Sequence, residues 1–410
     1  MAQGIRNGLS KARSFVARQQ GPFKVNLVRA SIQNFLTSLT TQYQPIYTIA
    51  LGASALQLGV VNGIGGLAAA GISAPIGWLT GKYGIKRMYL LATPLMALGA
   101  LLFAISPSWA WIIPAVFVAS LSLRMMQTAC SMVCGSYLRG EERATGMQLC
   151  DTLSSIPRIT APLIAAIVIT QFGGLNQDGI RPLYYVQAIG LLAILVLVMT
   201  KFEDPLRKSV DKATGFAEGI HDVLKNGTRV KTWTVFIVLS TTSMFLSSTY
   251  LSVFAAEVKS ADQFVIGGMA TASVLLPLAL SLPVGRLADT IGRKRVILLL
   301  GPLNSLSFVL LILAQGPTWI LVSGVFQGFA MLIFVTESAM SAELVPLQLI
   351  GSWFGFLGFF RGISAVIGPF LGGVIWDGFG PYHVMFSLIV LEASKFILLL
   401  LAIPETLKRN

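Results

Sequence analysis

Arg124 begins a row of polar residues inside a long apolar run. Gln127, Thr128 and Ser131 follow it at helical spacing, so all four side chains share one face of a helix. An arginine near the centre of a bilayer is energetically unfavourable and is retained for function by default. Such a face could bind an anionic solute or take part in moving a proton. The alternative is a structural role in which Arg124 pairs with an acid of the same half of the chain.

Two further arginines, Arg158 and Arg361, lie at a similar predicted depth. At about 1.5 Å per residue, each of the three is roughly 20 Å from the inner end of its run. Asp151 precedes Arg158 by seven residues, so the two share a face but lie about 10 Å apart along it. Arg124, Asp151 and Glu337 are the candidates among the charged residues for binding a proton or another ion.

Acidic residues are scarcer than arginines at this depth. Glu337 lies in the inner part of its run, and Glu392 precedes Lys395 by one helical turn, where the two can neutralise each other. The resulting positive excess predicts an anionic or carboxylate-bearing solute. The alternative is that Arg361 pairs with Glu392, and Arg158 with an acid on another run.

Two polar stripes repeat at an offset of 206 residues and supply further candidate binding residues. Polar stripes in lipid must face protein or water, and the alternative here is helix packing through small hydroxyl residues. Gln42, Tyr43 and Tyr250 lie near the predicted outer ends of these stripes and are candidate binding residues as well. The remaining candidates from these stripes and from a second glutamine-containing run are Asn34, Thr37, Thr41, Ser243, Ser247 and Gln327.

The elements that must position these residues are membrane-spanning helices. The chain has 410 residues, of which 54% are hydrophobic and 11% charged, against about 25% charged in soluble domains. Apolar runs near the 20 residues that cross about 30 Å predict helices rather than barrel strands. About twelve spans are expected: Lys24–Ala50, Ala55–Thr80, Arg87–Ile105, Trp109–Leu138, Ala144–Thr170, Leu183–Thr200, Lys231–Ala256, Gln263–Ala288, Val296–Ala314, Thr318–Glu343, Leu347–Ile375 and Tyr382–Ile403.

Basic residues predict the orientation of these spans. Of 30 lysines and arginines, 24 fall on one predicted side and two, Arg181 and Lys259, on the other. The remaining four, Arg124, Arg158, Arg361 and Lys395, fall inside spans. We therefore expect a multi-pass protein of the plasma (inner) membrane with both termini in the cytoplasm. The net charge of +13 then reports topology and does not indicate a nucleic-acid partner.

Five segments follow from this pattern: a basic N-terminal surface segment (1–23), an N-terminal six-helix bundle (24–200), a cytoplasmic linker with an amphipathic helix (201–230), a C-terminal six-helix bundle (231–403) and a cytoplasmic tail (404–410). Three cysteines and two histidines predict no metal site, and no phosphate-binding glycine loop or catalytic triad appears. We expect no cofactor and no enzymatic activity.

The stretch SAPIGWLTGKYGIKRMYLL, beginning at Ser73, recurs 208 residues later as SLPVGRLADTIGRKRVILL, beginning at Ser281. Duplicated membrane halves with a basic inner turn are typical of secondary transporters. Each turn contains a glycine that permits a tight reversal. The matching residues and the acid of the second copy are Gly77, Gly84, Lys86, Arg87, Gly285, Asp289, Gly292, Arg293, Lys294 and Arg295.

The second copy resembles the loop signature G-x-x-x-D-x-x-G-R-K-R of the major facilitator superfamily, and the two halves of six spans resemble that family over the whole chain. The resemblance implies an all-α membrane protein with about twelve transmembrane helices, forming two pseudo-symmetric six-helix bundles around a central cavity. It also implies that Asp289 and the turn residues above form a conformational latch. In the first copy Gly81 replaces the acid, so a latch there must be weaker or built differently. The alternative is that the turns serve topology and hairpin folding only.

Arg124 and Gln127 are similar to the R-x-x-Q-G pattern of proton-coupled exporters in that family, with Thr128 in place of the glycine. We therefore expect a monomeric secondary transporter working by alternating access in the lipid bilayer. It would move a small amphipathic solute or organic anion, with proton-coupled efflux as the leading interpretation. Ion-coupled uptake of a small anionic metabolite is the alternative, and a non-transporting membrane sensor is the lesser alternative.

Overall fold

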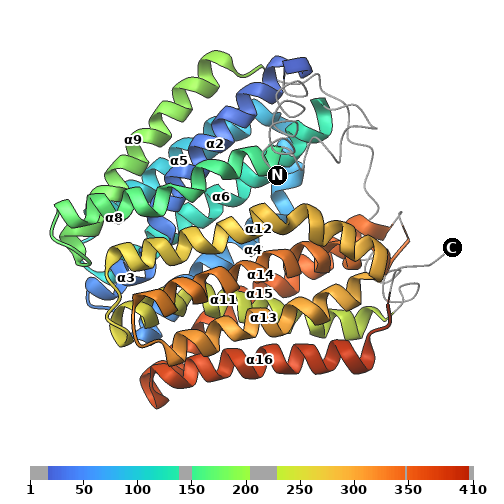
Figure 1. The fold of residues 1–410 in the computed structure, drawn as a ribbon. Helices are drawn as coiled ribbons and strands as arrows, with labels where there is room; N and C mark the ends of the chain where they lie inside the picture. The colour runs from blue at the N-terminus through green and yellow to red at the C-terminus, as the bar shows by residue number, and fades with distance from the viewer. Residues whose placement is uncertain (1–16, 138–149, 204–228, 347–348, 406–410) are drawn as a thin grey trace, which may run out of the picture.

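The computed structural model describes residues 17–137, 150–203, 229–346 and 349–405. This described part consists of helices and short connections, with no strand. Figure 1 shows the helices running side by side in two groups, one blue to green and one yellow to red. The all-helical fold predicted from the apolar runs is therefore confirmed.

The first group of helices comes from the N-terminal half. Most of its predicted spans appear as single long helices, and the first and the fifth are interrupted. The elements are α2 (Gly21–Thr41), α3 (Gln44–Ala50), α4 (Ala55–Tyr83), α5 (Ile85–Ile105), α6 (Trp109–Tyr137), the short 3₁₀ helix η2 (Ile156–Ile159), α8 (Ala161–Gln171) and α9 (Gln177–Lys201).

The second group comes from the C-terminal half, in which the predicted spans again correspond to long helices. The elements are α11 (Val230–Val253), the short π-helix η3 (Phe254–Val258), α12 (Gln263–Ile291), α13 (Arg293–Leu313), α14 (Pro317–Glu343), α15 (Ile350–Phe379) and α16 (Pro381–Ala402). The amphipathic helix predicted in 201–230 and the basic segment 1–23 lie almost entirely outside the described residues.

Eleven helical stretches among the described residues are long and apolar enough to cross a membrane. The first predicted span, now α2 with α3, is not among them because α2 carries several polar residues. One of these is Arg29, which is not among the four basic residues predicted to fall inside spans. The structure corrects that count, because Arg29 lies within α2 and is only 2% exposed.

Proline explains both interruptions in the N-terminal half. Pro45 lies in the first turn of α3 and Pro157 in the first turn of η2. Proline has no backbone N–H and clashes with the preceding turn, which favours a break at these two positions, whereas α5, α6, α12, α13 and α15 continue through internal prolines. Gln42 and Tyr43 therefore lie at the junction of α2 and α3, and Arg158 lies in the break before α8. Both breaks bring irregular backbone to places that the sequence analysis had assigned to continuous helix.

The two halves meet most closely where α4 packs against α15. A Cβ atom added at Gly59 would overlap the carbonyl oxygen of Pro369, and one at Gly66 would lie 2.8 Å from Cβ of Ala365. Added Cβ atoms at Gly71 and Gly358, further along the same helices, would meet nothing within 4 Å. Figure 1 shows the halves converging near α3 and spreading toward the end where α16 finishes. The two basic turns lie toward that end, since Lys86 contacts Met199 near the end of α9 and Lys294 contacts Leu400 near the end of α16.

Candidate functional site

The duplicated turns reverse the chain at glycine in both halves. Gly84 (φ 88°) separates α4 from α5, and Gly292 (φ 109°) separates α12 from α13. Both angles lie in the left-handed region that favours glycine. Gly77 and Gly285 lie within α4 and α12, and an added Cβ at Gly285 would meet open space. The glycines of the turns are therefore required by backbone conformation, as the repeat predicted.

The basic residues of the second turn are held mainly by acids other than Asp289. Arg293 lies 2.5 Å from Glu343 at the end of α14 but 4.0 Å from Asp289, whose side chain is 72% exposed. Glu405 accepts hydrogen bonds from the backbone N–H groups of Arg293 (3.0 Å) and Lys294 (3.4 Å). A carboxylate at this helix start is favourably placed. Arg295 is exposed.

The first turn is tied to α9. Lys86 Nζ donates to the carbonyl oxygen of Met199 at 3.3 Å, much as Lys294 Nζ donates to that of Leu400 at 3.0 Å. Arg87 lies beside Lys86 in the first turn of α5. The two turns thus share a lysine contact to the last helix of their own half. The Arg293–Glu343 ion pair belongs to the second half.

A buried ion cluster lies in the C-terminal half and joins three helices. Lys395 on α16 has its Nζ 2.9–3.0 Å from the two carboxylate oxygens of Glu392 and 4.0 Å from Oε1 of Glu337 on α14. Ser240 on α11 donates to the Glu337 carboxylate at 2.8–2.9 Å, and Ser243 donates to Glu392 at 2.8 Å. All three charged residues are 5% exposed or less. With every group ionised, the cluster carries one net negative charge.

Arg361 on α15 faces this cluster without a direct ion pair to it. Its guanidinium lies 5.5 Å from the ring centroid of Phe334 and within electrostatic range of both Glu337 and Arg124. Its Nε and Nη2 atoms are buried and have no hydrogen-bond partner among the described residues. The predicted alternative that Arg361 pairs with Glu392 does not hold, because Lys395 and Ser243 take that carboxylate.

In the described part of the chain, Arg124 and Arg158 likewise have no acidic partner within ion-pair distance. Both side chains are exposed, as are Gln127 and Asp151. None of the ion pairs between described residues includes Arg124 or Arg158, and Asp151 acts on Arg158 only at longer range. Arg124 and Arg361 therefore lie within long helices and Arg158 at the break before α8, and none of the three is in an ion pair between described residues, whereas the two buried carboxylates have partners.

The predicted polar stripes separate into different surroundings. Asn34 donates to Ser154 in the fifth span, and Thr41 donates to the backbone oxygen of Thr37. Ser247 donates to the backbone oxygen of Met244, and Gln327 donates to Ser323 at 3.3 Å on its own helix. Ser243 donates to Glu392 as described above. Several stripe residues therefore form hydrogen bonds within the protein, which agrees with a role in helix packing for part of each stripe.

Two buried tyrosines join the halves at their closed end. Tyr43 Oη lies 3.1 Å from the carbonyl oxygen of Pro162 and 2.9 Å from that of Gln263. Tyr250 Oη lies 2.8 Å from the carbonyl oxygen of Pro369 and 2.9 Å from that of Ala55. The two tyrosines are 207 positions apart, as are the two prolines, so the contacts follow the internal repeat. Gln42 caps α2 immediately before Tyr43.

A buried polar network around Arg29 was not foreseen. Arg29 Nε donates to Asn26 at 3.2 Å, Nη1 donates to Gln33, and the guanidinium lies 4.4 Å from the ring centroid of Tyr89. Asn26 in turn donates to Cys130 Sγ at 3.3 Å. None of the described acids pairs with Arg29. The signal available in the sequence was an arginine five residues inside an apolar run, flanked by two amides at helical spacing.

The candidate site therefore combines Arg124 on α6 and Arg361 on α15, which are within electrostatic range of each other, with the buried ion cluster of the C-terminal half. Among the described residues, no group of histidine, cysteine, aspartate and glutamate is placed to hold a metal ion. The geometry offers charge recognition and proton binding.

Comparison with known sequences gives the family. A family model described as Major Facilitator Superfamily matches residues 29–267 and 234–410. The MFS-type transporter Rv1877 of Mycobacterium tuberculosis is 40% identical over 94 residues, 23% of this chain and 14% of that protein. The class H tetracycline resistance protein of Pasteurella multocida is 31% identical over 128 residues, 31% of this chain and 32% of that protein. The chain thus spans about a third or less of the length of these relatives.

Comparison with solved structures supports the fold. The nucleoside transporter NupG aligns with a TM-score of 0.76 and 14% identity, over 93% of this chain and 98% of that chain. A D-xylose–proton symporter aligns with a TM-score of 0.73 and 14% identity, over 94% of this chain and 98% of that chain. At these identities the likeness extends to the fold alone.

Proposed function

Because the chain belongs to the major facilitator superfamily, we propose that it is a secondary transporter that exports a small amphipathic organic anion in exchange for protons. The members of this family are transporters and not enzymes, and the chain is a multi-pass membrane protein. The proposal concerns the substrate class, the direction of transport and the coupling ion.

The unpaired guanidinium of Arg361 carries the proposal of an anionic substrate. Two of its nitrogens are buried without a hydrogen-bond partner among the described residues, and a buried unsatisfied donor is unfavourable. The planar fork of arginine suits a carboxylate, sulfonate or phosphate, to which it can donate two parallel bonds. Arg124 lies within electrostatic range of Arg361, and like charges repel unless an anion lies between them. An anion bound there would also be attracted by Arg158.

Glu337 is our candidate for the coupling residue. It faces the charged groups Lys395, Glu392 and Arg361 and the hydroxyl of Ser240, which are on three neighbouring helices. Because the cluster of two carboxylates and one lysine has an excess negative charge, it has room for one proton. Arg124 and Asp151 remain candidates on the opposite half, where Asp151 is exposed to the open space.

One observation favours the second candidate function, proton-coupled uptake. A bound anion and the Glu337 carboxylate would both lie near Arg361, so each negative charge would disfavour the other. Protonation of Glu337 would relieve that repulsion, and a proton and an anion would then bind together. Export in exchange for protons requires the opposite coupling, in which the proton and the anion compete for binding. The similarity to a tetracycline resistance protein supports export.

Binding of matched probes tests the substrate class. We expect 4-methylbenzenesulfonate, which is anionic at every accessible pH, to raise the thermal unfolding temperature of the purified full-length protein. The cation 4-methylphenyltrimethylammonium should have no such effect. Arg361→Gln and Arg124→Ala should remove the protection, whereas Arg124→Lys should retain a fraction because it keeps the charge but loses the fork. Equal protection by the cation would contradict the proposal.

The remaining predictions concern topology and conformational control. We place both termini in the cytoplasm and the protein in the plasma (inner) membrane as a monomer. We also propose that the second turn acts as a conformational latch. Its main ion pair would be Arg293 with Glu343, and Asp289 would contribute less because it lies further from Arg293. The bounds of the two bundles and of the central linker stay predictions.

A further inference from the structure

A cavity of about 200 Å³ lies among the helices of the N-terminal half. Its walls come from α2, α4, α5, α6 and α9, together with Gln44 at the start of α3. We call this cavity the side chamber. Because α5 and α9 contribute to it, the side chamber reaches from the central helices into the interior of one bundle.

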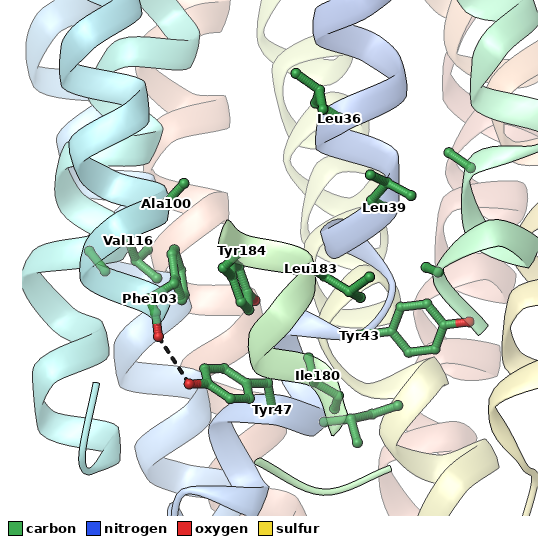
Figure 2. Packing of buried hydrophobic residues seen from close by; sticks show 14 of the residues in the cluster. Leu36, Leu39, Tyr43, Tyr47, Ala100, Phe103, Val116, Ile180, Leu183 and Tyr184 are labelled. Carbon is green, nitrogen blue, oxygen red and sulfur yellow. Dashed lines mark hydrogen bonds between the residues drawn. The ribbon is translucent and has the colours of Figure 1, made fainter. Parts of the chain in front are cut away.

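The walls of the side chamber combine polar and aromatic residues, and none of the lining residues is charged. The polar residues include Thr37, Asn62, Ser120 and Gln187. Among the aromatic residues, the ring of Tyr184 stacks on Phe103 with centroids 4.7 Å apart and planes 7° apart, and Figure 2 shows Tyr184 beside Phe103 and Val116. This combination suits an uncharged ring that carries a hydrogen-bonding group.

Several polar groups in these walls have unused hydrogen-bonding capacity. The hydroxyls of Thr37 and Tyr184 are buried and have no partner among the described residues. Asn62 accepts from Gln44 at 3.5 Å through Oδ1, and Gln187 Oε1 lies 3.2 Å from the hydroxyl of Thr40. The amide nitrogens of Asn62 and Gln187 are thus available as donors. Buried polar groups normally have a partner, so the side chamber requires a polar occupant.

The side chamber also has a defined mouth and a closed outer end. Thr41 is the exposed member of its lining, which places the mouth at the space between the halves. Ser120 in the wall lies one helical turn before Arg124. At the outer end, Tyr47 donates to the backbone oxygen of Phe103 at 2.9 Å, and Arg181 donates to that of Ser106 at 3.0 Å. An occupant therefore enters from the side where Arg124 lies.

We propose that the side chamber binds the uncharged, hydroxyl-bearing ring end of the transported solute while Arg124 holds its anionic end. The volume is below the about 300–1,000 Å³ of a drug-sized pocket, so the side chamber takes one ring and not a whole large molecule. Only the part concerning Arg124 rests on the proposed function. The chemistry of the chamber walls is independent of the charge at the other end.

Two isosteric pairs of probes test the side chamber on the full-length protein in lipid nanodiscs. The anionic pair is 4-hydroxybenzenesulfonate and 4-methylbenzenesulfonate, and the neutral pair is 4-hydroxybenzyl alcohol and 4-methylbenzyl alcohol. Within each pair a hydroxyl replaces a methyl group of the same size. We expect the hydroxylated member of both pairs to bind about fivefold to tenfold more tightly, since one satisfied hydrogen bond has roughly that effect on affinity.

Paired variants on the same helices locate this preference. Tyr184→Phe and Ser120→Ala should reduce the preference for the hydroxylated probe to within about twofold. The matched controls are Tyr185→Phe, an exposed tyrosine of α9, and Ser122→Ala, whose hydroxyl already donates to the backbone oxygen of Val118. Both controls should keep the full preference.

The outcomes separate the side chamber from the proposed function. Loss of both anionic probes in Arg124→Ala, with the neutral pair unaffected, supports both proposals. A preference for the hydroxylated probe that is seen only with the neutral pair would support binding in the side chamber and contradict the proposal of an anionic substrate. Equal binding within each pair, no binding of any probe, or a preference that survives Tyr184→Phe and Ser120→Ala would overturn the side chamber, whose walls would then hold water alone.

Discussion

The charged residues of the C-terminal half illustrate what spacing alone can predict. Glu392 and Lys395 are one helical turn apart, so their mutual neutralisation is foreseeable, and the structure has them 2.9 Å apart. The addition of Glu337 from a different helix depends on where the fold places α14 relative to α16, which no local pattern encodes. Arg29 is a separate case, because its position depends on where α2 begins.

We expect Lys395→Met to destabilise the protein strongly. The substitution removes the cation between two buried carboxylates, and breaking a buried ion pair from one side typically costs about 3–5 kcal/mol. Thermal unfolding in nanodiscs measures the effect. The double variant Lys395→Met with Glu392→Gln should recover most of the loss, because it removes the carboxylate left without its partner. Equal stability of the single and double variants would show that the two residues do not interact energetically.

At the scale of elements, the repeated hairpins and the approximate span limits were predictable from the sequence. The apolar runs and the two matching turns predict two helical hairpins, which the structure shows as α4 with α5 and α12 with α13. The breaks at α2–α3 and at η2 were not predicted, although Pro45 and Pro157 were visible, because proline also occurs inside unbroken spans such as α15. The tyrosine contacts were not predicted for another reason. The polar stripes align at an offset of 206 residues, whereas Tyr43 and Tyr250 are 207 residues apart, so that alignment does not pair them.

The close approach of α4 to α15 predicts a conformational mutant. Gly59→Ala places a methyl group against the Pro369 carbonyl oxygen and 2.9 Å from the Tyr250 hydroxyl oxygen, so the closed end must open. We expect the variant to populate a state open at the tyrosine end. Distances between spin labels on the outer ends of the two halves, measured by double electron–electron resonance, should lengthen.

Gly71→Ala is the matched control on the same helix. An added Cβ there meets nothing within 4 Å, so the distance distribution should remain that of the wild type. If Gly59→Ala and Gly71→Ala gave the same distribution, the contact of α4 with α15 would not control the closed end.

At the scale of the whole molecule, composition and repeats were sufficient to predict a helical membrane protein of two related halves. The family match and the solved structures agree with that prediction. Which end of the molecule is closed could not be predicted, because an alternating-access protein has the same sequence in every state. The proposed substrate class also depends on side-chain pairing: Lys395, and not Arg361, contacts Glu392, and two nitrogens of Arg361 have no hydrogen-bond partner among the described residues.

The central claim is that unpaired arginines make this molecule a transporter of organic anions. Uptake of radiolabelled 4-methylbenzenesulfonate into proteoliposomes with an imposed pH gradient tests it most directly, since the permanent charge prevents passive entry. The account predicts uptake by the wild type and none above protein-free vesicles by Arg361→Gln. Exchange with protons predicts faster uptake when the lumen is acidic, and cotransport predicts faster uptake when the outside is acidic. Undiminished uptake by Arg361→Gln, or none by a correctly folded wild type, would contradict the account.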